Sequence, residues 1–96
     1  MKIKVQIDEL VEKIDRLRLE LEQEANKMNL VSPFVNQFAN LAFEADKLDN
    51  PSLNIEEFNE KLSGLLSAVE LGDFDLFADQ MEFEMKPLLE HWKSLI

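Results

Sequence analysis

The chain contains no cysteine, threonine or tyrosine, a single histidine and only two glycines. Without cysteine it can form no disulfide, no thiolate nucleophile and no cysteine-ligated zinc or iron–sulfur centre. Two glycines cannot build the glycine-rich loops that bind nucleotide phosphates. No signal-peptide-like apolar stretch begins the chain, and the longest uncharged run, residues 28–43, contains Pro33 and is too short to cross a bilayer. We therefore expect a cytoplasmic protein without a membrane segment.

Basic residues are scarce, since ten stand against twenty acidic residues and the net charge is -10. Binding to a phosphate backbone depends on counterions released by lysine and arginine, so nucleic acid is excluded as an expected partner, and an anionic membrane surface is equally unfavourable. Residues 30–96 hold thirteen acidic and four basic side chains. Such a surface attracts a basic partner. It also keeps a protein soluble, and both interpretations remain open.

Apolar residues repeat at alternating intervals of four and three along the first third of the chain. The repeat comprises Ile3, Ile7, Leu10, Ile14, Leu17, Leu21 and, after a gap at Glu24, Met28. It predicts a first helix over about 8–28. Residues 2–7 also alternate with a period of two, which is typical of a half-buried strand. We favour a helix there because no second strand is evident to pair with it.

Three further helices are expected over about 33–48, 55–71 and 74–95. Ser32 followed by Pro33 predicts the start of the second helix, because serine can cap free N–H groups and proline tolerates the first helical position. Asn54 with Glu57 predicts the start of the third helix, and Gly72 predicts its end. Short connections favour antiparallel neighbours. The sequence thus predicts a single all-α domain over 1–96, an antiparallel up-down bundle of four helices.

Two residues interrupt the expected helices. Gly64 lies inside the third helix, where either close approach of a neighbouring backbone or simple surface tolerance would explain it. Pro87 lies inside the last helix, where it removes a bond to the Phe83 carbonyl and predicts a kink or a break near residues 85–87. Asp73 is expected to cap the start of this last helix.

Catalytic and metal-binding patterns are weak. His91 lies near Ser94 and Glu90 on a helix close to residue 96, with no oxyanion hole or pocket evident around them. Four carboxylates match some positions of a calcium-binding loop, but alanine and phenylalanine occupy the positions that require glycine and an oxygen ligand. These residues are Asp73, Asp75, Asp79 and Glu84. We therefore expect no enzymatic activity, no cofactor and no metal.

Several apolar residues lie outside the stripes that would form a core. Leu76, Phe83 and Pro87 point away from the apolar stripe of the last helix. The second helix has an apolar arc wider than a core requires, widened by Val35 and Phe43, and Leu19 is an outlier on the first helix. Either the bundle wraps these positions or they contact another chain, and we favour a contact. These six residues are the candidate partner-binding positions.

The stretch from Leu71 to Leu89, with the tryptophan that follows, resembles the C-terminal sequence of small helical proteins from Gram-positive bacteria. The matching positions are Gly72, Asp73, Ala78, Asp79, Glu82, Phe83, Glu84, Pro87 and Trp92. Asp75 and Gln80 depart from the more apolar residues of that pattern. The resemblance covers about a quarter of the chain, implies a bacterial helical domain and carries no known activity.

These observations predict a non-enzymatic helical protein–protein interaction module that associates with itself as a homodimer, because its helices carry apolar area beyond what one core needs. The alternative is an acidic inhibitor or chaperone that masks a basic or aggregation-prone protein. That alternative rests on size, acidity and helicity alone.

Overall fold

The computed structural model describes residues 2–96, with Lys2 described by its backbone alone, and it confirms an all-α fold of four helices. The first three are α1 (Lys2–Gln23), α2 (Met28–Lys47) and α3 (Ile55–Glu70). The fourth helix consists of α4 (Phe74–Gln80), the π-helical turn η1 (Met81–Met85) and α5 (Lys86–Leu95), which follow one another without a loop. Residues 2–96 contain no strand.

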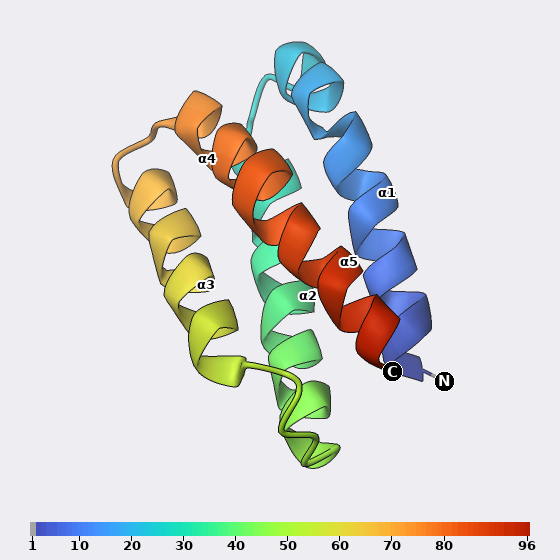
Figure 1. Cartoon of the computed structure of the whole chain (residues 1–96). Coiled ribbons are helices and arrows are strands. Elements are labelled where there is room, and N and C mark those ends of the chain that lie inside the picture. Colours follow the sequence, from blue (N-terminus) through green and yellow to red (C-terminus); the bar gives the residue numbers. More distant parts are fainter. Residues whose placement is uncertain (1) are drawn as a thin grey trace.

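Successive helices run in opposite directions, as Figure 1 shows. Both α1 and α3 pack against α2 and against the fourth helix, whereas among residues 2–96 α2 makes no comparably close approach to the fourth helix. Figure 1 accordingly shows α2 behind the fourth helix. The two therefore lie on opposite sides of the bundle. This diagonal relation determines which surface residues can act together.

Among residues 2–96 the fully buried residues are all apolar, and they form one continuous core through the bundle. The six-residue repeat of α1 from Ile3 to Leu21 forms one wall of it, and none of these side chains is more than 6% exposed. At the centre Phe58 of α3 stacks on Trp92 of α5 with ring centroids 5.1 Å apart, and its other neighbour is Phe38 of α2 at 6.1 Å. Aromatic side chains from three helices thus meet in the middle of the molecule.

The first helix has different limits from those predicted. It begins at Lys2, not near residue 8, so the strand interpretation of residues 2–7 is wrong. Ile3 and Ile7 are buried, and their burial against the core holds the first turns in the helix. The helix ends at Gln23, not at Met28, and the Lys27 ammonium folds back and donates to the Leu21 carbonyl at 2.8 Å, which satisfies one of the free carbonyls of the last turn.

The second helix begins five residues earlier than predicted, at Met28. Ser32 therefore does not cap it, and Pro33 lies inside the helix. The chain turns instead at Asn26, whose side-chain oxygen accepts from the Met28 N–H at 3.2 Å and whose backbone carbonyl accepts from the Asn29 N–H at 3.0 Å. A tight turn before Met28 thus provides the start that the sequence analysis assigned to Ser32.

The starts of the third and fourth helices are as predicted. The Asn54 side chain accepts from the Glu57 N–H at 3.0 Å, and the Asp73 side chain accepts from the Leu76 N–H at 3.0 Å. Gly72 has a φ of 70°, the left-handed conformation expected after the third helix. These local signals depend on neighbours three residues away, which is why the sequence specifies them.

The fourth helix leaves α geometry one turn before Pro87. In η1 the Lys86 N–H donates to the carbonyl of Met81, five residues back. Proline has no N–H, so the Phe83 carbonyl lacks the donor that residue 87 would supply in a regular α-helix. The widened turn therefore lies at residues 81–85, mostly before the predicted position at residues 85–87.

Candidate protein-interaction surfaces

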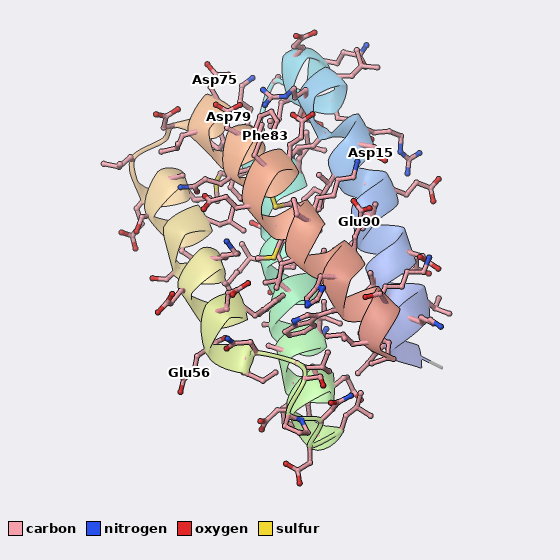
Figure 2. All side chains as sticks on the ribbon, in the orientation of Figure 1. Asp15, Glu56, Asp75, Asp79, Phe83 and Glu90 are labelled. Atoms are coloured by element: carbon pink, nitrogen blue, oxygen red, sulfur yellow. The ribbon has the colours of Figure 1, made fainter. Side chains whose placement is uncertain are left out.

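The outer side of the fourth helix presents a phenylalanine to solvent. Phe83, the middle residue of η1, is 69% exposed, and Leu76 and Pro87 on the same helix are also exposed. Figure 2 shows Asp75, Asp79 and Phe83 following one another along this helix. We call this surface the Phe83 face. It consists of Leu76, Phe83 and Pro87 with the carboxylates Asp75, Asp79, Glu82 and Glu84.

The Phe83 face is strongly acidic. Residues 62–85 hold six carboxylates and no lysine or arginine. Among the described residues, Arg18 of α1 and Lys61 of α3 pair with its carboxylates from the two flanks. Lys86 of the fourth helix, which pairs with Asp15 of α1, lies at the far end of the face beside Pro87. Arg18 pairs with both Asp79 and Glu82, whereas Lys61 lies 3.8 Å from a Glu84 oxygen. Carboxylates thus flank Phe83 on the α1 side and on the α3 side.

These carboxylates stay accessible despite their ion pairs. The side chains of Asp79, Glu82 and Glu84 are 55%, 45% and 53% exposed. Two hydrogen bonds raise the pKa of the Arg18 guanidinium, the larger effect coming from Asp79 and the smaller from Glu82. Such exposed pairs contribute little to stability. Because the carboxylates are about half exposed, further cations can still reach their oxygens.

Two more ion pairs connect the fourth helix to α1. Lys86 bonds to Asp15, and Lys93 pairs with Asp8. The two lysines are seven residues apart, as are the two aspartates, so the pairs form rungs along an antiparallel pair of helices. The hydrogen bond to Asp15 raises the pKa of Lys86. With the Arg18 pairs they mark the register of the fourth helix along α1, which the buried apolar core holds in place.

The outer side of α2 differs in charge. Residues 28–43 carry no ionisable side chain, which leaves this side of a strongly acidic molecule uncharged over most of its length. Phe43 is 62% exposed and Met28 is 42% exposed. We call this surface the α2 face. Its exposed members are Met28, Asn29, Ser32, Pro33, Asn36, Ala39, Asn40 and Phe43.

The six candidate partner-binding residues do not form one surface. Leu76, Phe83 and Pro87 share the fourth helix, whereas Phe43 lies on α2, diagonally across the bundle. Leu19 is 59% exposed on the outer side of α1. Val35 is only partly exposed and packs against the core, so it offers little to a partner. The structure thus separates an acidic face from an uncharged face.

A small polar cavity between α1 and α2 was not predicted from the sequence. Its volume is about 170 Å³, and Gln6, Glu9, Leu10, Gln37 and Asn40 line it. The side-chain oxygens of Gln6 and Gln37 are buried without a hydrogen-bond partner among the described residues. Both glutamines adjoin apolar stripes that the sequence analysis treated only as core, and no motif marks them.

Several polar residues that the sequence marked as catalytic or metal-binding candidates instead contact the backbone, cap a helix or form ion pairs. His91 is exposed, and the Ser94 hydroxyl donates to the His91 backbone carbonyl at 2.6 Å. Asp73 caps α4, whereas Asp79 and Glu84 face Arg18 and Lys61. Within the described part of the chain, no three carboxylates or histidines gather closely enough to hold a metal ion.

Among residues 2–96, no helix combines the length and apolar character that crossing a membrane requires.

Fold and surfaces define a small acidic helical bundle with two different exposed faces. The chain belongs to the family described as Domain of unknown function (DUF8042), whose model matches residues 2–95. Comparison with curated proteins and with solved structures gave no match. The resemblance of residues 71–92 to Gram-positive proteins stays a prediction.

Proposed function

We propose that this chain is a non-enzymatic protein–protein interaction module that associates with itself through the α2 face. The observation that carries the proposal is the missing charge on that face. Two copies that each carry a net charge of -10 repel one another. They approach with least electrostatic cost where residues 28–43 of both molecules meet.

The composition of the α2 face also suits a contact between helices. Phe43 supplies a large apolar group, and the neighbouring exposed positions hold small or uncharged polar residues such as Ser32, Asn36 and Ala39. Small residues let two helix backbones come close, and amides can form hydrogen bonds across the contact. The Lys47 ammonium lies 4.3 Å from the Phe43 ring centroid, which leaves the other side of the ring for a second copy.

Sedimentation equilibrium of the full chain at tens of micromolar tests this proposal. We expect a dimer, and we expect Phe43→Glu to raise its dissociation constant at least tenfold, which corresponds to about 1.4 kcal/mol. Leu19→Glu is the matched control, because Leu19 is equally exposed but lies on α1. Circular dichroism verifies that both variants fold. A monomeric wild-type chain at these concentrations would contradict the proposal.

The Phe83 face favours a second function, the masking of a basic or aggregation-prone protein. Carboxylates on both sides of an exposed phenylalanine suit a ligand that is both cationic and apolar. Self-association and masking use opposite sides of the bundle, so one molecule can do both. We place the module in the cytoplasm, a setting with which the cysteine-free sequence is compatible.

A further inference from the structure

We propose that the Phe83 face binds a basic amphipathic helix of another protein. In this complex Phe83 packs against the apolar stripe of the partner helix, and lysine or arginine side chains beside the stripe reach the carboxylates on each side. The inference rests on the proposed masking function, for which it names the site and the class of partner, and it does not depend on self-association.

The first argument is the exposure of the apolar centre. Phe83 is 69% exposed, whereas Phe77 of the same helix is fully buried in the core. Leu76 and Pro87 extend the exposed apolar line to both sides of Phe83. The eleven steps from Leu76 to Pro87, at about 1.5 Å each, span about 16 Å, which matches three turns of a partner helix laid along this face. Leu76 and Phe83 are seven residues apart, so they lie on one side of the helix, where the apolar stripe of a second helix can pack against them.

The second argument is charge complementarity. The α1 side of Phe83 holds Asp79 and Glu82, and the α3 side holds Glu84. All three side chains are about half exposed, and Asp75 forms no ion pair with the described residues. A helix with one apolar stripe between two rows of cations fits this arrangement. The cations of the partner helix would bind the same carboxylates, which Arg18 and Lys61 contact only from the α1 side and the α3 side.

The same charges exclude other occupants. A second copy that docked through its own Phe83 face would bring carboxylates against carboxylates, since residues 62–85 carry no lysine or arginine. Nucleic acid and anionic lipid surfaces present phosphates, which the same carboxylates repel. A basic polypeptide is the class of macromolecule that these carboxylates favour.

A synthetic amphipathic helix of leucine and lysine is the probe, and a sequence with glutamate in place of each lysine is its control. Isothermal titration with the full chain at low salt measures binding. We expect the lysine peptide to bind, the glutamate peptide not to bind, and Phe83→Ala to weaken binding at least tenfold. Val5→Ala is the matched variant, because it removes an exposed apolar side chain from the end of α1 that lies beside Lys93, away from Phe83, and should leave binding unchanged.

Amide chemical-shift mapping locates the peptide on the surface. Shifts confined to residues 74–90 and to the adjoining parts of α1 and α3 support the proposal. An equal loss of binding in Phe83→Ala and Val5→Ala, or shifts spread over every acidic surface, would show that charge alone attracts the peptide and would overturn it. So would the absence of binding by the wild-type chain.

The two proposals fail separately. A chain that forms dimers but binds no basic helix overturns the Phe83 proposal and leaves self-association standing. A monomeric chain that binds the peptide with wild-type dependence on Phe83 supports this inference and overturns self-association. Failure of both measurements overturns the interaction role itself.

Discussion

Phe58 and Phe83 are chemically identical side chains in opposite environments. Phe58 is fully buried and stacks on Trp92, whereas Phe83 is 69% exposed. Truncating Phe58 removes buried apolar area and leaves a cavity, so we expect Phe58→Ala to lower the free energy of unfolding by about 3–5 kcal/mol. We expect Phe83→Ala to change it by less than about 0.5 kcal/mol. Urea denaturation measures both, and a similar loss for the two variants would place Phe83 in the core.

The pair between Lys86 and Asp15 makes stability depend on pH in the alkaline range. Because the pKa of Lys86 is raised in the folded state, its contribution is present below the unfolded pKa and is lost as the pH rises through the folded pKa. We expect wild type to exceed Lys86→Met in unfolding free energy at neutral pH. The difference should shrink above about pH 10.4, the ordinary lysine value.

Lys86→Arg is the control for this experiment. Arginine keeps its charge at higher pH, so the contribution of the pair should persist where the wild-type chain loses it. An alkaline decline of equal size in the arginine variant would mean that other groups cause it.

Individual side chains show where sequence information suffices. The caps at Asn54 and Asp73 were predicted because each needs only a free N–H three residues ahead. Ser32 has the same chemistry but lies within a helix that starts earlier, at a turn around Asn26. The exposure of Phe83, Phe43 and Leu19 follows from their distance from an apolar stripe. Ion-pair partners such as Lys86 and Asp15 were not predictable, because pairing depends on the register between two helices.

The two glycines, one inside α3 and one just after it, have different physical roles. Gly64 lies in α3 with the Gln80 side chain 3.6 Å from the position of an added Cβ, an ordinary contact, so no neighbouring backbone requires a glycine there. We expect Gly64→Ala to raise the free energy of unfolding by about 1 kcal/mol through helix propensity. Gly72 has a positive φ, so Gly72→Ala should lower it by about 1 kcal/mol. Thermal unfolding measures both, and equal signs would contradict this explanation.

The boundaries of the helices show the limit of periodicity. The repeat in α1 predicts which side faces the core, and all six of its residues from Ile3 to Leu21 are buried. It does not predict where the helix ends, because Met28 continues the spacing but begins α2. Pro87 similarly predicts an irregular fourth helix, but the widened turn lies upstream, where the missing donor changes the backbone bonding.

At the level of the bundle, Phe43 and Phe83 were predicted as surplus apolar residues and grouped as partner-binding positions. Their opposite placement depends on which helices are diagonal. In an up-down bundle whose successive helices are neighbours, the second and fourth helices are diagonal in either handedness, so this relation follows from the topology and not from any short sequence pattern.

Salt should affect the two proposed contacts in opposite directions. Two copies with like net charge repel, and at 0.1 M salt the screening length is about 10 Å, so added salt should strengthen self-association through the uncharged α2 face. Binding of a basic helix to the Phe83 face should weaken over the same range. Sedimentation and titration at low and high salt measure the two trends. A dimer that dissociates as salt rises would indicate ion pairs in its interface.

The rungs between α1 and the fourth helix join distant parts of the chain, since Asp8 pairs with Lys93 and Asp15 with Lys86. During synthesis the ribosome makes α1 first, and its partner emerges only after the other helices. Until then the apolar stripe of α1 has α2 beside it but no cover from the fourth helix. A nascent chain therefore exposes apolar surface for most of its elongation. Chaperones that bind emerging polypeptides should bind it until about residue 93 has left the exit tunnel.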